Sequence, residues 1–332
     1  MGEGGGMERS NVLLDVKNLK MYYDVGSTYI RAVDGLSFSL SGAETLGVVG
    51  ESGCGKSSLA TTLLRLLPSN AKILEGEIIF NGIDLTKLPE EKMRKEIRWK
   101  NISIVFQGSM SALNPVIKVG DQVAEAILAH ENGVTKREAL ERAVEILAMV
   151  GLDKSVAKRY PFELSGGQRQ RAVIAMALAL RPKVVIADEP TTALDVIVQA
   201  QVLKLLESLQ EKFGLSLMLI SHDISVVSEL SDRVAVMYAG KFVEIGPAES
   251  VLLKPAHPYT RLLIEAVPSV REAKKTLKYI PGQPPDLANP PSGCRFHPRC
   301  PYAMDVCRKE EPKLVEVEKN HYAACHLLGG SG

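Results

Sequence analysis

The chain has 332 residues, of which 45% are hydrophobic and 24% charged, a composition suited to one large globular domain and an accessory one. Its 40 basic and 39 acidic residues leave a net charge of +1, which argues against a uniformly basic surface of the kind that tracks nucleic acid. The longest apolar run, AVIAMALAL at residues 172–180, is less than half of the roughly 20 residues that cross a bilayer, so we expect no membrane span.

The first ten residues, MGEGGGMERS, carry glycines and charges where a secretory signal would carry an apolar stretch. We therefore expect residues 1–10 to form a flexible leader and the protein to stay in the cytosol. In that reducing compartment structural disulfides are improbable, which leaves metal binding, catalysis or packing for the five cysteines.

From residue 11 to about residue 250, apolar runs alternate with amphipathic segments, as they do in an α/β domain. Continuous runs at residues 44–50, 184–188 and 216–221 are typical of central parallel strands that are buried on both faces. Between about residues 89 and 165 the strand signal is limited to residues 101–106, and two helical stripes predict an inserted helical subdomain. The stripes consist of Val123, Ile127 and Leu128, then Leu140, Val144 and Leu147.

The segment GESGCGKSS at residues 50–58 lies between a buried run and an amphipathic segment, which is the context of the phosphate-binding pattern GxxxxGK[ST]. Its glycines let the backbone turn tightly and aim N–H groups at phosphate oxygens, and the helix that follows adds its positive end. We expect Lys56 at the β and γ phosphates and Ser57 at Mg²⁺; the alternative is a glycine-rich turn that happens to contain a lysine. The expected nucleotide contacts are Gly50, Ser52, Gly53, Cys54, Gly55, Lys56, Ser57 and Ser58.

Two carboxylates end the buried run VVIADEP at residues 184–190, at the strand end where ligands of α/β sheets collect. We expect Asp188 in the Mg²⁺ shell. Glu189 projects differently and is placed to orient or deprotonate an attacking water, so it is the candidate general base. A solvated turn or a helix cap is the alternative interpretation of this pair.

The segment LSGGQRQR at residues 164–171 closely resembles the signature of ATP-binding cassette ATPases, and the family's other elements occur in the expected order. Gln107 in VFQ matches the residue that links the sheet to the helical subdomain and contacts Mg²⁺ and the reaction site. TTALD at residues 191–195 follows the acidic pair, and His222 in SHD matches the switch histidine. The resemblance implies an α/β fold of the cassette-type P-loop ATPases, with a central mostly parallel sheet, an antiparallel β subdomain, the inserted helical subdomain and a small irregular Cys-rich C-terminal segment at residues 251–332.

Ser165 can cap the helix that begins in this signature, and the exposed N–H groups of the helix end then form an anion site with no phosphate of the same chain nearby. The resemblance implies that two such chains sandwich two ATP molecules head to tail and that hydrolysis requires closure of this dimer. His222 would contact the γ-phosphate and Asp195 the opposing chain. The residues expected at the nucleotide of the opposing chain are Ser165, Gly166, Gly167 and Gln168.

Three tyrosines precede the phosphate loop in MYYDVGSTYI: Tyr22, Tyr23 and Tyr29. One ring is expected to stack on adenine, because stacking on an aromatic side chain stabilises a bound base by roughly 1–3 kcal/mol. We expect Tyr23 in this role; a tyrosine of the core or of a loop is the alternative.

Segments between these motifs resemble the ATPase subunits of bacterial and archaeal dipeptide and oligopeptide importers over about residues 11–327. They are residues 104–115, 160–171, 257–263, 280–287 and 293–307. The segment IPGQPPDL at residues 280–287 is similar to the D-type subunit of the paired D and F subunits.

Four cysteines lie in the proline-rich C-terminal segment: Cys294, Cys300, Cys307 and Cys325. Four thiols are a complete ligand set for a [4Fe-4S] cluster or a structural zinc, and a metal centre would give this segment a core. The spacing does not match the paired C-x-x-C of zinc ribbons, and the resemblance implies a [4Fe-4S] cluster. Zinc, with His297 or His321 replacing one thiol, and cysteines packed without metal are the alternatives.

The resemblance implies an ATP-hydrolysing subunit at the cytoplasmic membrane face that powers a separate permease, which docks near residues 107–130. We expect a second ATPase subunit, similar or identical, an extracytoplasmic substrate-binding protein as an indirect partner, and no nucleic acid. Relatives handle dipeptides, longer peptides, nickel or oligosaccharides. Two rival classes use a similar cassette. A nucleic-acid or ribosome clamp usually has a coiled-coil or zinc insertion or a second cassette. An accessory ATPase of a soluble enzyme complex usually lacks a Cys-rich C-terminal segment.

Overall fold

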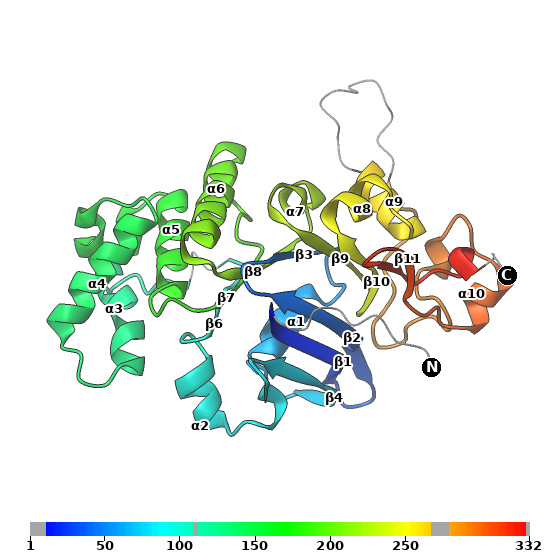
Figure 1. The fold of residues 1–332 in the computed structure, drawn as a ribbon, viewed down its shortest axis with the longest axis horizontal. Helices are drawn as coiled ribbons and strands as arrows, with labels where there is room; N and C mark the ends of the chain where they lie inside the picture. The colour runs from blue at the N-terminus through cyan, green and yellow to red at the C-terminus, as the bar shows by residue number, and fades with distance from the viewer. Residues whose placement is uncertain (1–10, 109–111, 267–278, 330–332) are drawn as a thin grey trace.

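The computed structural model describes residues 11–108, 112–266 and 279–329. The leader predicted for residues 1–10 lies outside these ranges. The described chain forms two β-sheets with helices on both sides, a helical lobe at one end and the C-terminal segment at the other (Figure 1). None of the helices in these ranges has the length and apolarity that membrane crossing requires.

The larger sheet has eight strands in the order β11-β12-β10-β9-β3-β8-β7-β6. From β6 to β9 all neighbours are parallel, whereas β9, β10, β12 and β11 pair antiparallel. The continuous apolar runs predicted the central strands correctly, because every residue of β3, β7 and β8 is buried. The eight strands are β3 (Thr45–Val49), β6 (Ile102–Val105), β7 (Val184–Asp188), β8 (Ser216–Ser221), β9 (Arg233–Tyr238), β10 (Lys241–Pro247), β11 (Val315–Glu318) and β12 (His321–Ala323).

A second, antiparallel sheet of four strands faces the larger one across helix α1 (Lys56–Leu63) (Figure 1). Inward-facing side chains of this sheet, such as Leu14 and Leu40, belong to the same hydrophobic cluster as Leu59 of α1 and Ile186 of β7. This shared core fixes the start of α1 against the central strands. The four strands are β1 (Val12–Asp24), β2 (Tyr29–Ser41), β4 (Ala71–Phe80) and β5 (Ile83–Asp84).

The helical lobe follows β6 in the chain and lies within the span of about residues 89–165 in which a helical subdomain was expected. Its longest helices, α3 (Val119–His130) and α4 (Lys136–Met149), pack with α5 (Gly166–Ala177). Val123 and Ile127 of the predicted stripe of α3 are buried, whereas Leu128 was wrongly included: it is 39% exposed, and Ala124 is buried beside the other two. The buried face of α3 therefore lies on the Ala124 side of the predicted stripe.

The remaining helices lie mainly on the face of the larger sheet that is opposite α1 (Figure 1). They are α6 (Val196–Phe213), α7 (Ile224–Leu230), α8 (Ala248–Leu253) and α9 (Pro258–Glu265), with the short α2 (Glu90–Lys92) in the region before β6 and α10 (Asp305–Lys309) in the C-terminal segment. Short 3-10 or π turns occupy residues 85–87, 93–97, 154–158, 161–163, 297–299 and 326–329.

The C-terminal segment is mostly turns, but it shares a core with the rest of the chain. Phe296 is buried against Tyr238 of β9 and Tyr259 of α9. In addition, β12 pairs with β10, and the buried carboxylate of Glu244 accepts hydrogen bonds from the backbone of Ala256 and His257 and contacts His321 Nε2 at 2.7 Å. These contacts join the segment to the edge of the larger sheet.

His257 predicts a measurable pH dependence of stability. Its ring is buried, accepts the backbone N–H of Tyr259 at the start of α9, and its burial lowers its pKa from 6.5 to about 3. Between these two pKa values the ring is protonated in the unfolded state and neutral in the folded state. The contribution of His257 to the free energy of unfolding is therefore fully present above about pH 6.5 and decreases as the pH falls toward 3. Between pH 7 and pH 5 we expect this residue to remove about 2 kcal/mol.

The substitution His257→Asn keeps a side-chain acceptor at the helix start but removes the titrating ring. Urea unfolding of both proteins at pH 7 and pH 5 measures the effect, since other titrating groups contribute equally to each protein. The free energy of unfolding of the variant should fall less than that of the wild type. Equal losses in the two proteins would contradict the assignment.

Candidate functional site

The loop between β3 and α1 is shaped by close backbone contacts. A Cβ atom on Gly50 would lie 2.1 Å from the carbonyl oxygen of Met237, and one on Gly55 would lie 2.0 Å from that of Ala32. Gly55 also has a φ of 110°, which disfavours residues with a side chain. The loop can therefore follow this path only with glycine at both positions.

Lys56 begins α1 and is buried beneath this loop. Its Nζ donates hydrogen bonds to the carbonyl oxygens of Gly50 at 2.6 Å and Glu51 at 2.9 Å. No side chain caps α1, so the N–H groups of its first turn are open to an anion. An ammonium group, a helix start and a glycine loop together form an arrangement that can bind phosphate groups.

Asp188 ends β7 and has the chemistry of a cation ligand. It is 2% exposed, it lies near the Ser57 hydroxyl, and its Oδ1 has no partner among the described residues. Burial raises the pKa of Asp188; the Ser57 hydroxyl opposes this shift, the Glu189 charge adds to it and Lys56 opposes it. A buried carboxylate oxygen without a partner beside a serine hydroxyl fits the oxygen ligands that Mg²⁺ prefers.

Three side chains converge on Glu189, the residue after β7. Gln107 donates to Oε2 from its amide at 2.8 Å, Thr192 donates to Oε2 from its hydroxyl at 2.9 Å, and His222 Nδ1 lies 3.0 Å from Oε1. The structure thus brings together the predicted residues Gln107, Glu189 and His222. Thr192 was missed, although it lies in the TTALD segment whose Asp195 was selected.

A cavity of about 330 Å³ runs from the phosphate loop to Glu189. Tyr23 lines it and bonds through its hydroxyl to Ser58, whereas Tyr22 donates to Asp34 and Tyr29 is 48% exposed. Tyr23 is therefore the tyrosine of the three that faces this cavity. Its lining residues are Tyr23, Ile30, Ala32, Ser52, Gly53, Gly55, Lys56, Ser57, Ser58, Gln107, Glu189 and Leu287.

Leu287 comes from the C-terminal segment, and the sequence reasoning did not place it at this site. It lines the cavity together with Tyr23, Ile30 and Ala32, and its carbonyl oxygen accepts the backbone N–H of Arg31 at 3.0 Å. No sequence signal near Leu287 indicates the contact, because the pairing partner lies on β2.

The predicted signature residues lie away from this cavity. Ser165 and Gln168 form a reciprocal capping box at the start of α5, with Ser165 Oγ accepting the Gln168 N–H and Gln168 Oε1 accepting the Ser165 N–H. Asp195 caps α6 by accepting the N–H of Val198. Gly166 and Gly167 lie in the first turn of α5. The described part of the chain therefore brings neither helix start to its own phosphate loop.

The four C-terminal cysteines lie close enough to influence one another. Burial raises the pKa of Cys294 to about 11, a backbone N–H of Phe296 opposes the shift, and the other three cysteines add to it. Burial also raises the pKa of Cys300 and of Cys325, and the nearby backbone N–H groups of Tyr302 and Leu327 oppose these shifts. Cys307 Sγ accepts the N–H of Met304 at 3.5 Å.

A single metal ion does not fit these cysteines as they stand. Among residues 11–108, 112–266 and 279–329, no three side chains of His, Cys, Asp or Glu are grouped to hold one. Both histidines of the zinc alternative are engaged elsewhere: His321 with the buried Glu244, and His297 with the carbonyl oxygen of Cys294. The geometry does not support a zinc site.

Comparison with known families matches two regions of the chain. Residues 33–192 match the family model described as "ABC transporter", and residues 243–307 match that described as "Oligopeptide/dipeptide transporter, C-terminal region". The chain is similar to the oligopeptide transport ATP-binding protein AppF of Bacillus subtilis (strain 168), with 47% identity over 95% of this chain and 97% of that protein. It is also 45% identical to OppD of Escherichia coli (strain K12), over 96% of this chain and 94% of that protein.

Solved structures are similar over the cassette part. The ATP-binding cassette MJ0796, in a dimeric post-hydrolysis state bound to ADP and Pi, has a TM-score of 0.64 and 30% identity over 71% of this chain and 99% of that chain. CbiO1 of Clostridium perfringens, part of the ABC transporter complex cbiONQ, has a TM-score of 0.63 and 27% identity over 74% of this chain and 92% of that chain. These matches confirm the predicted α/β cassette fold.

We expect Leu287→Ala to weaken the affinity for ATP about three- to tenfold, because truncation of a partly buried leucine removes on the order of 1 kcal/mol of apolar contact. Calorimetric titration with ATP measures the change, and inorganic tripolyphosphate, which lacks the base, should bind both proteins equally. Leu253→Ala, at a side chain that is 73% exposed, is the matched control. An unchanged affinity for ATP would exclude Leu287 from the nucleotide cavity.

Proposed function

Because the chain belongs to the ABC transporter family and carries the oligopeptide/dipeptide transporter C-terminal region, we propose that it hydrolyses ATP to power the import of dipeptides or oligopeptides. The observation that carries this function is the convergence of Gln107, Glu189 and His222 at the end of the phosphate-loop cavity. Relatives named for peptide transport at about 45% identity favour peptides over oligosaccharides or nickel. The same relatives argue against a nucleic-acid clamp or a soluble enzyme complex.

The domain division and the subunit type remain part of the proposal. Residues 11–250 would form the ATPase domain, with the helical subdomain at about residues 89–165, and residues 251–332 the accessory segment. Relatives named D and F are similarly identical to the chain, AppF at 47% and AppD at 45%. The D-type assignment therefore depends on the segment at residues 280–287 alone.

In this proposal Glu189 is the general base, and its contacts indicate where water would bind. Each carboxylate oxygen offers two lone pairs. Oε2 already accepts hydrogen bonds from Gln107 and Thr192, whereas Oε1 is contacted, among the described residues, by His222 alone. The attacking water would thus approach Oε1, on the side of His222.

Lys56 would bind the β and γ phosphates, and Ser57 and Asp188 would hold Mg²⁺, with Gln107 as a further ligand through its amide oxygen. When bound, the cation neutralises charge on the transferring phosphoryl group. Asp188 suits this role because its buried Oδ1 lacks a partner among the described residues. Tyr23, which lines the same cavity, would stack on adenine.

The position of the start of α5 supports the proposal of a second ATPase subunit. Its N-terminus carries Ser165, Gly166, Gly167 and Gln168 and lies outside the phosphate cavity of its own chain, so it would bind the nucleotide of the opposing chain. Val196 and Ile197, which follow Asp195, are 82% and 73% exposed and would be covered by that chain. The similar cassette MJ0796 is itself dimeric.

An apolar groove of about 300 Å³ supports the predicted docking of a permease near residues 107–130. It is lined by Trp99, Phe106, Leu113 and Met176, among others, and Phe106 is 41% exposed next to Gln107. A permease segment seated here would contact the helical lobe and the residue before Gln107 together. The chain would then be peripheral on the cytoplasmic face of the membrane, and the extracytoplasmic substrate-binding protein would act on it only through the permease.

We also propose that Cys294, Cys300, Cys307 and Cys325 hold a [4Fe-4S] cluster. Such a cluster separates its four ligands more widely than a single ion does, so the absence of a single-ion site among the described residues is compatible with it. The backbone N–H of Met304 already donates to Cys307 Sγ, and backbone N–H groups near Cys294, Cys300 and Cys325 lower the pKa of those thiols; hydrogen bonds of this kind stabilise cluster thiolates. A cluster would also offset the unfavourable proximity of four thiolates.

The cluster is tested by iron and sulfide analysis of protein purified without oxygen, together with its visible absorption spectrum. We expect about four irons per chain and a brown colour that is lost in Cys300→Ser. The variant Cys54→Ser, at a cysteine outside the segment, should retain both. Colourless wild-type protein without iron would contradict the proposal.

The proposed function is tested by Glu189→Gln. We expect an unchanged affinity for ATP within about twofold and a loss of turnover of at least about a hundredfold, as is typical when a general base is removed. Phosphate release and peptide uptake are measured in the assembled transporter, with the equivalent substitution in the second ATPase subunit where that is a different chain. Glu211→Gln, at an exposed glutamate of α6, is the control; wild-type turnover of Glu189→Gln would remove Glu189 from this role.

A further inference from the structure

An arginine of the C-terminal segment reaches the phosphate loop. Arg299 donates two hydrogen bonds to the Glu51 carboxylate, from Nη1 at 2.6 Å and from Nη2 at 3.0 Å. Its side chain is only 5% exposed, and Glu51 is the second residue of the glycine-rich loop GESGCGKSS. Two parallel charge-assisted bonds fix both the distance and the orientation of the partners.

The other contacts of Arg299 leave its guanidinium little freedom. Nε donates to the carbonyl oxygen of Pro281 at 2.7 Å, and Nη1 also lies 3.3 Å from the hydroxyl of Tyr238. The planar group is thus held between the C-terminal segment and β9. Glu51 is bound to a rigid support.

The backbone of Glu51 connects the contact with Arg299 to Lys56. Its N–H donates to the hydroxyl of Tyr259 at 2.9 Å, and its carbonyl oxygen accepts a hydrogen bond from Lys56 Nζ at 2.9 Å. A shift of Glu51 would therefore move one of the two carbonyl oxygens that hold the phosphate-binding ammonium group.

We propose that Arg299 is a positioning residue for ATP binding and hydrolysis: by holding Glu51, it keeps the phosphate loop and Lys56 in the geometry that receives the phosphates. The inference rests on the proposed ATPase function. If Arg299 has this role, the loop between Cys294 and Cys300 helps to hold the nucleotide site in place. Removal of one partner of a largely buried, hydrogen-bonded charge pair is costly, which gives the contact a measurable effect.

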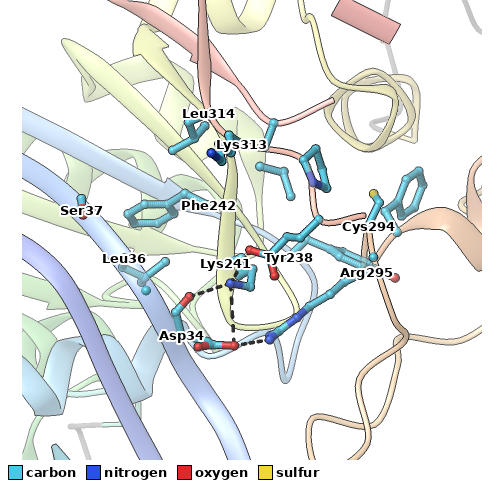
Figure 2. A pocket seen from close by; sticks show the side chains of 17 residues that line it. Asp34, Leu36, Ser37, Tyr238, Lys241, Phe242, Cys294, Arg295, Lys313 and Leu314 are labelled. Atoms are coloured by element: carbon cyan, nitrogen blue, oxygen red, sulfur yellow. Dashed lines mark hydrogen bonds and ion pairs between the residues drawn. The ribbon is translucent and has the colours of Figure 1, made fainter. Parts of the chain in front are cut away.

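Arg295, four residues earlier in the same loop, provides a matched comparison. Figure 2 shows its side chain pointing toward Asp34, where Lys241 also approaches. It pairs with the Asp34 carboxylate and with the carbonyl oxygen of Ala239, and it is buried like Arg299. Arg295 therefore anchors the same loop to β2 and to the turn after β9, without contacting Glu51.

The test compares Arg299→Gln, Arg295→Gln, Glu51→Gln and the double variant of Arg299 and Glu51, all in the full chain. Calorimetric titration with Mg²⁺–ATP and with AMP, which lacks the β and γ phosphates, measures affinity, and thermal unfolding measures stability. We expect Arg299→Gln to weaken ATP binding about tenfold and AMP binding by less than twofold. Glu51→Gln should have a similar effect, the double variant should lose no more than the weaker-binding single variant, and Arg299→Lys should recover part of the affinity.

Arg295→Gln should lower the melting temperature as Arg299→Gln does, but leave the affinity for ATP within about twofold of the wild type. The inference is overturned if Arg299→Gln loses stability without losing ATP affinity, if Arg295→Gln weakens ATP binding equally, or if the losses of the two single variants add in the double variant. Should Arg299→Gln fail to fold, Glu51→Gln tests the same contact from the loop side. A wild-type chain that does not bind ATP would contradict the proposed function as well, whereas normal wild-type binding with unaffected variants contradicts this inference alone.

Discussion

The site depends on the parallel pairing of four neighbouring strands. Since β3, β8, β7 and β6 run in the same direction, their carboxyl ends meet at one edge of the sheet, and the residue or loop after each strand arrives there. The phosphate loop follows β3, His222 follows β8, Glu189 follows β7, and Gln107 lies shortly after β6. The register holds Val49 beside Ser221 and Asp188 beside Ile220, so backbone hydrogen bonds of buried strands set the spacing of the site.

Glu189 is where this regular arrangement carries strain. Its φ of 48° lies in the left-handed region, which costs of order 1–3 kcal/mol for a residue with a side chain. The backbone N–H of Glu189 still bonds to the carbonyl oxygen of Ile220 at 2.9 Å, and Gln107, Thr192 and His222 hold the carboxylate. The strained turn separates Glu189 from Asp188, so that adjacent carboxylates serve different places: Asp188 beside Ser57, and Glu189 at the end of the cavity.

The strands and the phosphate loop could be predicted because their signals are local. Continuous apolar runs at residues 184–188 and 216–221 coincide with β7 and β8, and the glycine pattern around Lys56 has few other uses. Leu128 was misplaced because a stripe of apolar residues fixes the face of a helix only to within one position, and the packing of α3 decided which side is covered. Leu287 and Arg299 could not be found at all, since each contacts a partner more than 200 positions away in sequence and lies in a proline-rich stretch without periodicity.

The C-terminal segment shows why such long-range contacts matter for both of the parts they join. Proline-rich sequence buries little apolar surface of its own, and Phe296 supplies much of the shared core with Tyr238 and Tyr259. Arg295 and Arg299 are buried beside it, and a buried guanidinium is tolerated only when its charge and its donors are paired. Their carboxylate partners belong to β2 and to the phosphate loop. The segment can therefore pack only against a cassette in which Asp34 and Glu51 are already positioned to pair with these arginines. In turn, the packed segment holds the loop that contains Glu51.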